Sequence, residues 1–429
     1  MSATQVLHSV NITNDNDNFE KNENISRIAL NNMGDNIRCT DTDDNLSLFS
    51  YINCSVNDTE QLKRCRGIVY EGTNLISDCC RYTYEFLENE KENIEKIVND
   101  ENIKNCYIVD SFEGTLIRAF YYKTKWYMTT HRKLNMYKTK WSSKKYFGEY
   151  FEDALYNELK KNNKLEEMSL KLGKDVSLIS LMSKDQLVND FQECFLDKDK
   201  QYMFFLLAND DTRIVCNVPT QNETQIYHVG TYYNNEIHTD NNDIGLLKPK
   251  TYNFNNMKEL YDFVGKININ QTQGLMIYTP EPDCKFCKIL NNEYYFWNKI
   301  RDNVPSIKFR YLQLRNDKYK LNMLKNLYPK YLSDFETYEN ILFTISQKIL
   351  QAYFDRFINK KYTVVSKEEY NVIKMCHSWH MEDRDHNKIS IQKVSEMLDK
   401  QSPALLNKMI KSYLYTPITE PSVSENNDK

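Results

Sequence analysis

Glycine and proline are scarce in this chain of 429 residues, occurring 10 and 9 times. No Gly-rich phosphate loop, HExxH motif or GxSxG motif is present, so the enzyme classes that these motifs define are excluded. No apolar run reaches the length of a membrane span, since even residues 341–354 are interrupted by Gln347, Lys348 and Gln351. We therefore expect no membrane partner.

The cysteines do not form the pattern of a disulfide-bonded secreted protein. Eleven cysteines are spread unevenly over the chain and no signal peptide precedes them, which predicts reduced thiols in the cytoplasm. A zinc site could be built from Cys284 and Cys287 together with Cys376, His377 and His380. The two groups fall in different expected domains, so we favour ordinary reduced cysteines and helix histidines and predict no metal site.

Length and composition favour a globular protein with more than one domain. Hydrophobic residues make up 41% of the chain, which is enough for real cores, and the length predicts two or three domains. The net charge of −4 gives no global attraction to nucleic acid, so any basic surface must be local.

Residues 107–135 organise the rest of the chain. Apolar and polar residues alternate on both sides of Glu113 and Gly114, which predicts paired strands with a break at residues 111–114. A break of this kind is where a β-rich enzyme usually displays its chemistry. Before this stretch the spacings predict a helix over 82–99, and after it they predict helix over 147–200 and a buried strand over 202–208.

The strongest charge signal follows this break. Residues 118–147 contain nine basic residues and no acidic one, with aromatic residues between them. Cations alternating with aromatics suit a groove that follows a phosphate backbone while bases stack on rings; the alternative is a solvated hairpin with its aromatics packed inward. The predicted RNA-binding residues are Arg118, Lys123, Lys125, Trp126, Arg132, Lys133, Lys138, Lys140, Trp141, Lys144 and Lys145.

The order of short motifs resembles the phage-type RNA ligase family of covalent nucleotidyltransferases. Ser111-Phe112-Glu113-Gly114 is similar to the family's K-x-D-G, with serine in place of the lysine nucleophile. Upstream, Arg66-Gly67-Ile68-Val69 is similar to the strand that precedes this motif in the family. Arg213-Ile214-Val215 resembles the family's N-R-I-V, and this register places the F-E-x motif on Phe205-Leu206-Leu207.

The last two motifs are also altered. Gln273-Gly274-Leu275-Met276 resembles E-G-x-V with glutamine for glutamate, and Lys288-Ile289-Leu290 resembles K-x-K without its second lysine. A second register, through Phe286-Cys287-Lys288, would lose the first lysine instead. The resemblance implies degenerate catalytic positions at Ser111, Glu113, Leu206, Gln273 and Leu290. It implies remnants of a nucleotide pocket at Arg66, Gly67, Glu113, Gly114, Arg213, Gly274 and Lys288.

These replacements remove the chemistry that the resemblance implies. The family's lysine attacks the α-phosphate of ATP and forms a phosphoramidate that leaves easily, whereas a serine phosphodiester would be a poor donor. Leu206 cannot coordinate a metal ion, and Gln273 offers only a neutral oxygen. A displaced nucleophile at Lys104, Lys123 or Lys125 is the alternative, but surface or phosphate-contacting lysines are the favoured interpretation.

The sequence therefore predicts an α+β protein with the nucleotidyltransferase fold, an ATP-grasp-like RNA/DNA ligase fold of antiparallel sheets and helices, followed by an all-α C-terminal domain. The expected divisions are a disordered segment 1–44, the ligase-like domain 45–305, the helical domain 306–415 and a disordered tail 416–429. The clearest helical stripe contains Ile341, Ile345 and Ile349.

The expected function is that of a non-catalytic RNA- or nucleotide-binding protein of a large DNA virus, located in the host cytoplasm or the virion. One alternative is an active ATP-dependent RNA ligase with relocated catalytic residues, which would need ATP and Mg²⁺. The other is a structural scaffold. No cofactor is expected if the chain is not catalytic.

Overall fold

The computed structural model describes residues 30, 34–78, 81–141, 145–173, 175, 184–208, 216, 224–234, 236–239, 244–280 and 284–415. Arg213 and Lys144, both singled out in the sequence, lie outside these residues, as do the tail 416–429 and residues 1–29.

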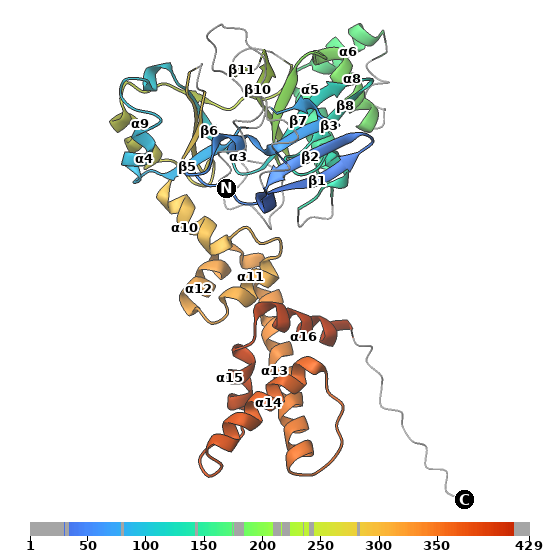
Figure 1. Ribbon diagram of the computed structural model, residues 1–429, viewed down its shortest axis with the longest axis vertical. Helices are drawn as coiled ribbons and strands as arrows, with labels where there is room; N and C mark the ends of the chain where they lie inside the picture. The colour runs from blue at the N-terminus through green and yellow to red at the C-terminus, as the bar shows by residue number, and fades with distance from the viewer. Residues whose placement is uncertain are drawn as a thin grey trace, which may run out of the picture.

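Three β-sheets form the N-terminal part of the protein (Figure 1). Sheet A is the antiparallel meander β1 (Ile37–Asp43), β2 (Leu46–Tyr51), β3 (Arg66–Glu71) and β4 (Asn74–Ser77). Sheet B has the order β12-β6-β13-β14-β5 and consists of β5 (Thr83–Leu87), β6 (Tyr107–Ser111), β12 (Thr251–Tyr252), β13 (Gly274–Tyr278) and β14 (Phe286–Leu290). Sheet C has the order β11-β10-β9-β7-β8 and consists of β7 (Thr115–Tyr122), β8 (Lys125–Thr129), β9 (Gln201–Leu207), β10 (Gln225–Tyr233) and β11 (Glu236–His238). Strands β14 and β5 pair in parallel, whereas the other pairs are antiparallel.

Two sequence expectations need correction here. Strand β1 lies inside the segment 1–44 that was expected to be disordered, and it pairs with β2 from Ile37 to Asp43. None of its side chains is buried, so this edge strand needs no apolar pattern that the sequence could reveal. The helix expected over 82–99 is instead strand β5 followed by the short helix α4 (Lys91–Glu95), because residues 83–87 add a strand to sheet B beside β14.

Helices cover the outer faces of sheets B and C. Over sheet C lie α5 (Phe147–Lys161), α6 (Lys164–Leu172) and α8 (Lys184–Phe195). Helix α5 buries Phe147, Phe151, Leu155 and Leu159, whose spacing of four residues produces a single apolar stripe. The outer face of sheet B packs against α4 and α9 (Met257–Val264), with Ile94 and Leu260 among the buried contacts.

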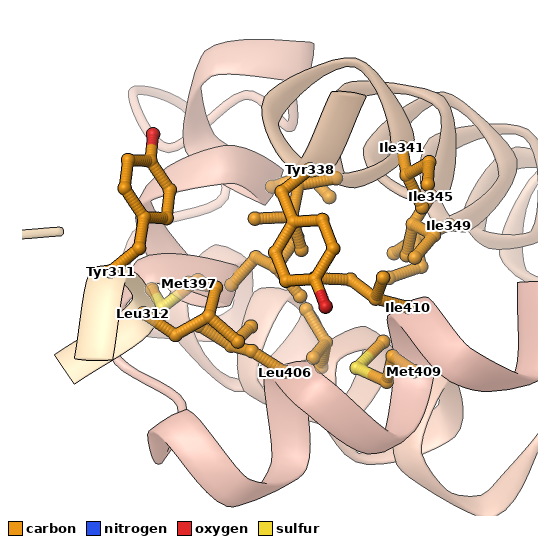
Figure 2. Close-up of a cluster of buried hydrophobic side chains, with 14 of the residues drawn as sticks. Tyr311, Leu312, Tyr338, Ile341, Ile345, Ile349, Met397, Leu406, Met409 and Ile410 are labelled. Atoms are coloured by element: carbon orange, nitrogen blue, oxygen red, sulfur yellow. The ribbon is translucent and has the colours of Figure 1, made fainter. Parts of the chain in front are cut away.

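A separate helical region follows the sheets and extends away from them (Figure 1). It contains α10 (Asn292–Arg301), α11 (Ile307–Leu314), α12 (Lys318–Leu327), α13 (Leu332–Phe357), α14 (Lys367–Glu382), α15 (Ile391–Asp399) and α16 (Pro403–Tyr415). The expected stripe of Ile341, Ile345 and Ile349 on α13 is buried against α11, α15 and α16 (Figure 2). The protein is thus α+β with largely antiparallel sheets and a C-terminal helical region, as the sequence predicts.

Candidate functional site

The chain crosses from sheet B to sheet C at residues 111–115. Strand β6 ends at Ser111, and strand β7 begins at Thr115 beside Leu206 of β9. Gly114 lies so close to β9 that a Cβ atom there would be 2.5 Å from the carbonyl oxygen of Leu206. Only glycine fits at this crossing, so the break predicted from the sequence is the point at which two sheets are joined.

A cavity of about 130 Å³ lies between the inner faces of sheets B and C. Its lining is largely apolar and comes from Val109, Phe112, Leu116, Met203, Phe205, Val229, Pro249, Met276, Tyr278 and Phe286. The polar and charged lining residues are Arg66, Arg81, Thr83, Asp110, Ser111 and Lys288. An apolar cavity of about 150 Å³ accommodates one aromatic ring, whereas pockets for drug-sized ligands occupy roughly 300–1,000 Å³. The cleft therefore has room to enclose one ring-sized group, and the rest of a larger ligand would have to lie outside the enclosed space.

Ser111 is buried at the end of β6 and is held by Gln273 from the adjoining segment. The Nε2 atom of Gln273 donates to the Oγ atom of Ser111 at 3.1 Å and also to the carbonyl oxygen of Phe112. The backbone carbonyl of Ser111 accepts from the Gln273 amide at 3.0 Å and from the Thr272 hydroxyl at 2.6 Å. The hydroxyl of Ser111 is thus positioned by a neutral donor, with no base among these contacts to activate it.

Three cations line the cleft, and each is oriented by a neighbour. Arg66 donates to the Thr83 hydroxyl at 2.8 Å and to the Arg81 carbonyl at 3.1 Å. Arg81 donates to the carbonyl oxygen of Cys284 at 2.8 Å. Lys288 lies 3.0 Å from a carboxylate oxygen of Glu85, which is half-exposed. Such fixed guanidinium and ammonium groups are suited to binding an anionic ligand group.

Asp110 is the carboxylate that lines the cleft among the described residues. Burial raises the pKa of this carboxyl, while the Tyr252 hydroxyl, which donates to it at 2.9 Å, opposes the shift. Divalent ions such as Ca²⁺ take several oxygen ligands, so a single carboxylate is a poor basis for a metal site.

Glu113 does not line the cleft. Its carboxylate accepts from the backbone amide of Cys216 at 3.2 Å. Burial raises the pKa of Tyr294 on α10, and the charge of Glu113 adds to that effect. The glutamate of the crossing is therefore directed toward the start of the helical region.

Two positions expected at the site face elsewhere. Leu206 is buried in the core beneath α5, because neighbouring residues of a strand point to opposite faces. The β9 side chains that line the cleft are Met203 and Phe205. Leu290 packs with Cys216 and Tyr294. In the second register of the final motif, however, both Phe286 and Lys288 line the cleft.

Two more glycines of the motifs occupy positions that exclude a side chain. Gly67 has φ +83°, and a Cβ atom there would lie 2.8 Å from Cα of His131. Gly274 pairs with Ser111 in sheet B, and a Cβ atom there would collide with the carbonyl of Ile289. Both glycines allow backbone segments to approach closely.

The basic and aromatic stretch forms a less open cationic surface than its sequence predicts. Arg118 is completely buried and donates to the carbonyl oxygen of Gly67 and the hydroxyl of Ser77. Four lysines are paired with carboxylates from other segments, namely Lys123 with Glu71, Lys125 with Asp44, Lys133 with Asp41 and Lys145 with Asp153. Trp126 and Trp141 pack against the core beneath α5. Within the described residues, Arg132, Lys138 and Lys140 are the exposed cations of this stretch for which no carboxylate lies within ion-pair distance.

Two alternatives left open by the sequence, a metal site and a displaced lysine nucleophile, have no supporting arrangement of side chains in the described residues. No group of three or more His, Cys, Asp or Glu side chains is arranged there to hold a metal ion. The candidate displaced nucleophiles Lys104, Lys123 and Lys125 do not line the cleft.

Among the described helices, none combines the length and the apolar character needed to cross a membrane.

Sequence reasoning missed several cleft residues. Arg81, Met203 and Tyr278 line the cavity but match no motif, and Phe205 and Met276 stand in motifs without having been predicted as site residues. The alternation of β9 could have indicated that Met203 and Phe205 share a face. No pattern in the sequence around Arg81 indicates that this residue lines the same cavity as Met203 and Phe205.

The fold and the cleft define an α+β protein with two facing sheets and a C-terminal helical region. No protein-family model matches the chain. It is 27% identical over 378 residues to the immediate-early protein ICP-46 homolog of Invertebrate iridescent virus 6. This match covers 84% of this chain and 79% of that protein. It is 28% identical over 307 residues to the homolog from Invertebrate iridescent virus 3, which covers 69% and 61%. A shorter match to the immediate-early protein ICP-46 of Frog virus 3 has 26% identity over 167 residues and covers 39% and 37%.

Two solved structures of archaeal ATP-dependent RNA ligases are similar to this chain at a low level. The first, form 1, has a TM-score of 0.34 and 9% identity and covers 68% of each chain. The second, form 2, has a TM-score of 0.36 and 10% identity and covers 86% of this chain and 90% of that chain.

Proposed function

We propose that this chain is a non-catalytic, RNA-ligase-like protein of a large DNA virus that binds a nucleotide, free or at the end of an RNA, in the cleft between sheets B and C. The observation that carries the proposal is the pairing of Ser111 with Gln273 at the point where the two sheets join. The motif resemblance predicts that these two residues, which are far apart in the sequence, lie at one site. Ser111, Arg66 and Lys288 do line one cavity, and Gln273 contacts it through Ser111.

The absence of catalysis follows from the groups in the cleft. Ser111 lacks the amine that would form a labile phosphoramidate, and its hydroxyl accepts from a neutral amide. The resemblance places a metal-binding glutamate at position 206 of β9. The neighbouring side chain that lines the cavity is Phe205, which cannot bind an ion. Asp110 alone is an insufficient substitute.

Binding is supported by the combination of apolar surface and cations. A ring-sized apolar space bordered by Phe112, Phe205 and Phe286 suits a nucleobase. Arg66, Arg81 and Lys288 supply positive charge for phosphate oxygens. For an RNA ligand, the exposed Arg132, Lys138 and Lys140 could contact further phosphates. The similarity to proteins named immediate-early supports a role early in infection.

The test has two parts on the purified full chain. Titration with ATP and with a 5′-phosphorylated RNA oligonucleotide should give saturable binding. Arg66→Ala should weaken that binding by at least about tenfold, since a hydrogen bond to a charged group contributes roughly 1.5–3 kcal/mol. The exposed Arg38 on β1 provides the control Arg38→Ala, which should bind like the wild type. Phe205→Trp, which narrows the cleft without changing charge, should weaken binding independently.

The second part is incubation with labelled ATP and Mg²⁺, followed by acid treatment. No acid-labile nucleotide should remain on the protein. A covalent label on a lysine would instead support an active ligase with relocated chemistry, and a chain that binds neither ATP nor RNA would support a scaffold. Either result overturns the proposal.

A further inference from the structure

The loop between α13 and α14 exposes apolar side chains that nothing in the described protein covers. It leaves the end of α13 far from the β-sheets (Figure 1). Ile358, Tyr362 and Val364 are 62%, 91% and 76% exposed. Three large apolar side chains exposed within seven residues form a patch of the kind that marks an interaction site rather than a scattered surface residue.

The same loop carries two positive charges. Between the end of α13 at Phe357 and the start of α14 at Lys367 it contains Lys360 and Lys361 and no acidic residue, while Asp355, Glu368 and Glu369 flank it on the two helices. In the described part of the chain, no carboxylate lies within ion-pair distance of Lys360 or Lys361, although the charge of Lys361 helps to lower the pKa of the nearby Asp355 carboxyl. The neighbouring α14–α15 loop has mixed charge, with Asp383 paired with His386. Of these two loops, the α13–α14 loop is therefore the one with a positive charge next to exposed apolar side chains.

The exposure is built into the fold. The backbone turns at Lys360, which has φ +55°, a conformation that is uncommon for residues other than glycine but recurs where helices end. The amide of Asn359 donates to the Phe354 carbonyl at 2.9 Å, and the amide of Lys361 donates to the Asp355 carbonyl at 2.8 Å. At the two ends of the loop, Phe357 and Val365 pack against the helical core. The ends are thus anchored while the apolar side chains between them point outward.

We propose that this loop docks onto an anionic phospholipid surface, with Ile358, Tyr362 and Val364 entering the boundary between headgroups and acyl chains and Lys360 and Lys361 contacting lipid phosphates. Apolar insertion combined with basic residues is the pattern of interfacial membrane binding. Two of the three exposed apolar side chains are aliphatic and cannot stack on bases, so the loop fits lipid better than single-stranded RNA. Surface docking requires no spanning helix, so the proposal is compatible with the finding that no described helix could cross a membrane.

The test uses vesicle flotation with the full chain and phosphatidylcholine vesicles made with or without phosphatidylserine. The wild type should float with the anionic vesicles and less with the neutral ones. The variants Ile358→Ser/Tyr362→Ser/Val364→Ser and Lys360→Glu/Lys361→Glu should each lose at least about tenfold in partitioning. Tyr362→Trp should preserve binding, because tryptophan is favoured at membrane interfaces.

The matched control is Leu170→Ser on α6, since Leu170 is 84% exposed but lies outside the loop. This variant should float like the wild type, and circular dichroism should show that all variants are folded. The proposal is wrong if the wild type does not float, if the loop variants float unchanged, or if the loop variants lose single-stranded RNA binding while vesicle binding persists. Nucleotide binding in the cleft should be unaffected by the loop variants, so the two proposals can fail separately.

Discussion

Gln273 donates from Nε2 to the Oγ atom of Ser111 across 3.1 Å, and the two residues are 162 positions apart in the chain. The same nitrogen donates to the carbonyl oxygen of Phe112. The glutamine therefore serves two acceptors at the junction of sheets B and C. A carboxylate in its place would have no proton to give to either.

The first prediction is that Gln273→Glu, which introduces the residue of the resembled motif, destabilises the protein. A buried carboxylate would face the carbonyl of Phe112 without a donor, and unsatisfied buried groups cost about 1–3 kcal/mol or more. Burial should raise the pKa of the new carboxyl, so the loss of unfolding free energy should be smaller at acidic pH, where the protonated group can donate. Urea unfolding at neutral and acidic pH measures this. Ser111→Ala, which removes one acceptor, is the milder control, and a Gln273→Glu variant as stable as the wild type at neutral pH would show that the junction tolerates a carboxylate.

The second prediction concerns Arg118, which is buried between sheets A and C rather than exposed to a ligand. Arg118→Lys keeps the charge but loses the planar fork that reaches both the Gly67 carbonyl and the Ser77 hydroxyl. We expect the free energy of unfolding to fall by about 2–4 kcal/mol, since a buried charged network is broken. The exposed residues provide Lys138→Ala and Lys140→Ala as controls, which should stay within about 0.5 kcal/mol of the wild type. Equal urea midpoints for all three variants would contradict the structural role of Arg118.

The sequence predicts those features that depend on local pattern. The alternation of residues 107–135 gives strands β6, β7 and β8, and the spacing of Ile341, Ile345 and Ile349 gives the buried face of α13. Properties set by distant residues were not accessible. The lysines of the basic stretch acquire carboxylate partners from other segments, as Lys133 does from Asp41, and no local rule identifies such pairs.

The candidate site likewise has features that the sequence predicts and features that it does not. Ser111 and Lys288 line one cleft, as the motif resemblance requires. On β9, the predicted position Leu206 faces the core, and its neighbour Phe205 faces the cleft. A shift of one residue reverses the face of every side chain in a strand. A short motif that has lost its charged residue therefore cannot tell which β9 side chain faces the cleft.

The third prediction concerns Gly67, where β3 approaches the segment that contains His131. In Gly67→Ala, the new Cβ atom would lie 2.8 Å from Cα of His131 in a backbone conformation with φ +83°. We expect a loss of about 2–4 kcal/mol, combining backbone strain with displacement of a neighbouring segment. Gly72→Ala is a matched control, because Gly72 has φ +57° but a Cβ atom there would meet no heavy atom within 4 Å. It should lose only about 1 kcal/mol in thermal or urea unfolding, and equal losses at the two positions would show that the close approach does not matter.

The fourth prediction is a pH dependence that arises from His228 on β10. Burial, with a smaller contribution from the charge of Lys248, lowers the pKa of His228 from 6.5 to about 4. Above pH 6.5 the imidazole is neutral in both the folded and the unfolded chain. Between pH 6.5 and about 4 the unfolded chain binds a proton that the folded chain does not, so the free energy of unfolding falls as the pH is lowered through this window and levels off below it.

The size of this effect should be about 3 kcal/mol, measured by urea unfolding across the window. His228→Gln removes the titrating group while leaving a side chain that can reach the Thr231 hydroxyl, which lies 3.0 Å from Nε2 in the native protein. Its stability should therefore depend less on pH than that of the wild type. Parallel profiles for the wild type and His228→Gln would show that His228 does not remain neutral in the folded protein over this range. They would also show that the helix-covered side of sheet C is more accessible to water than its burial indicates.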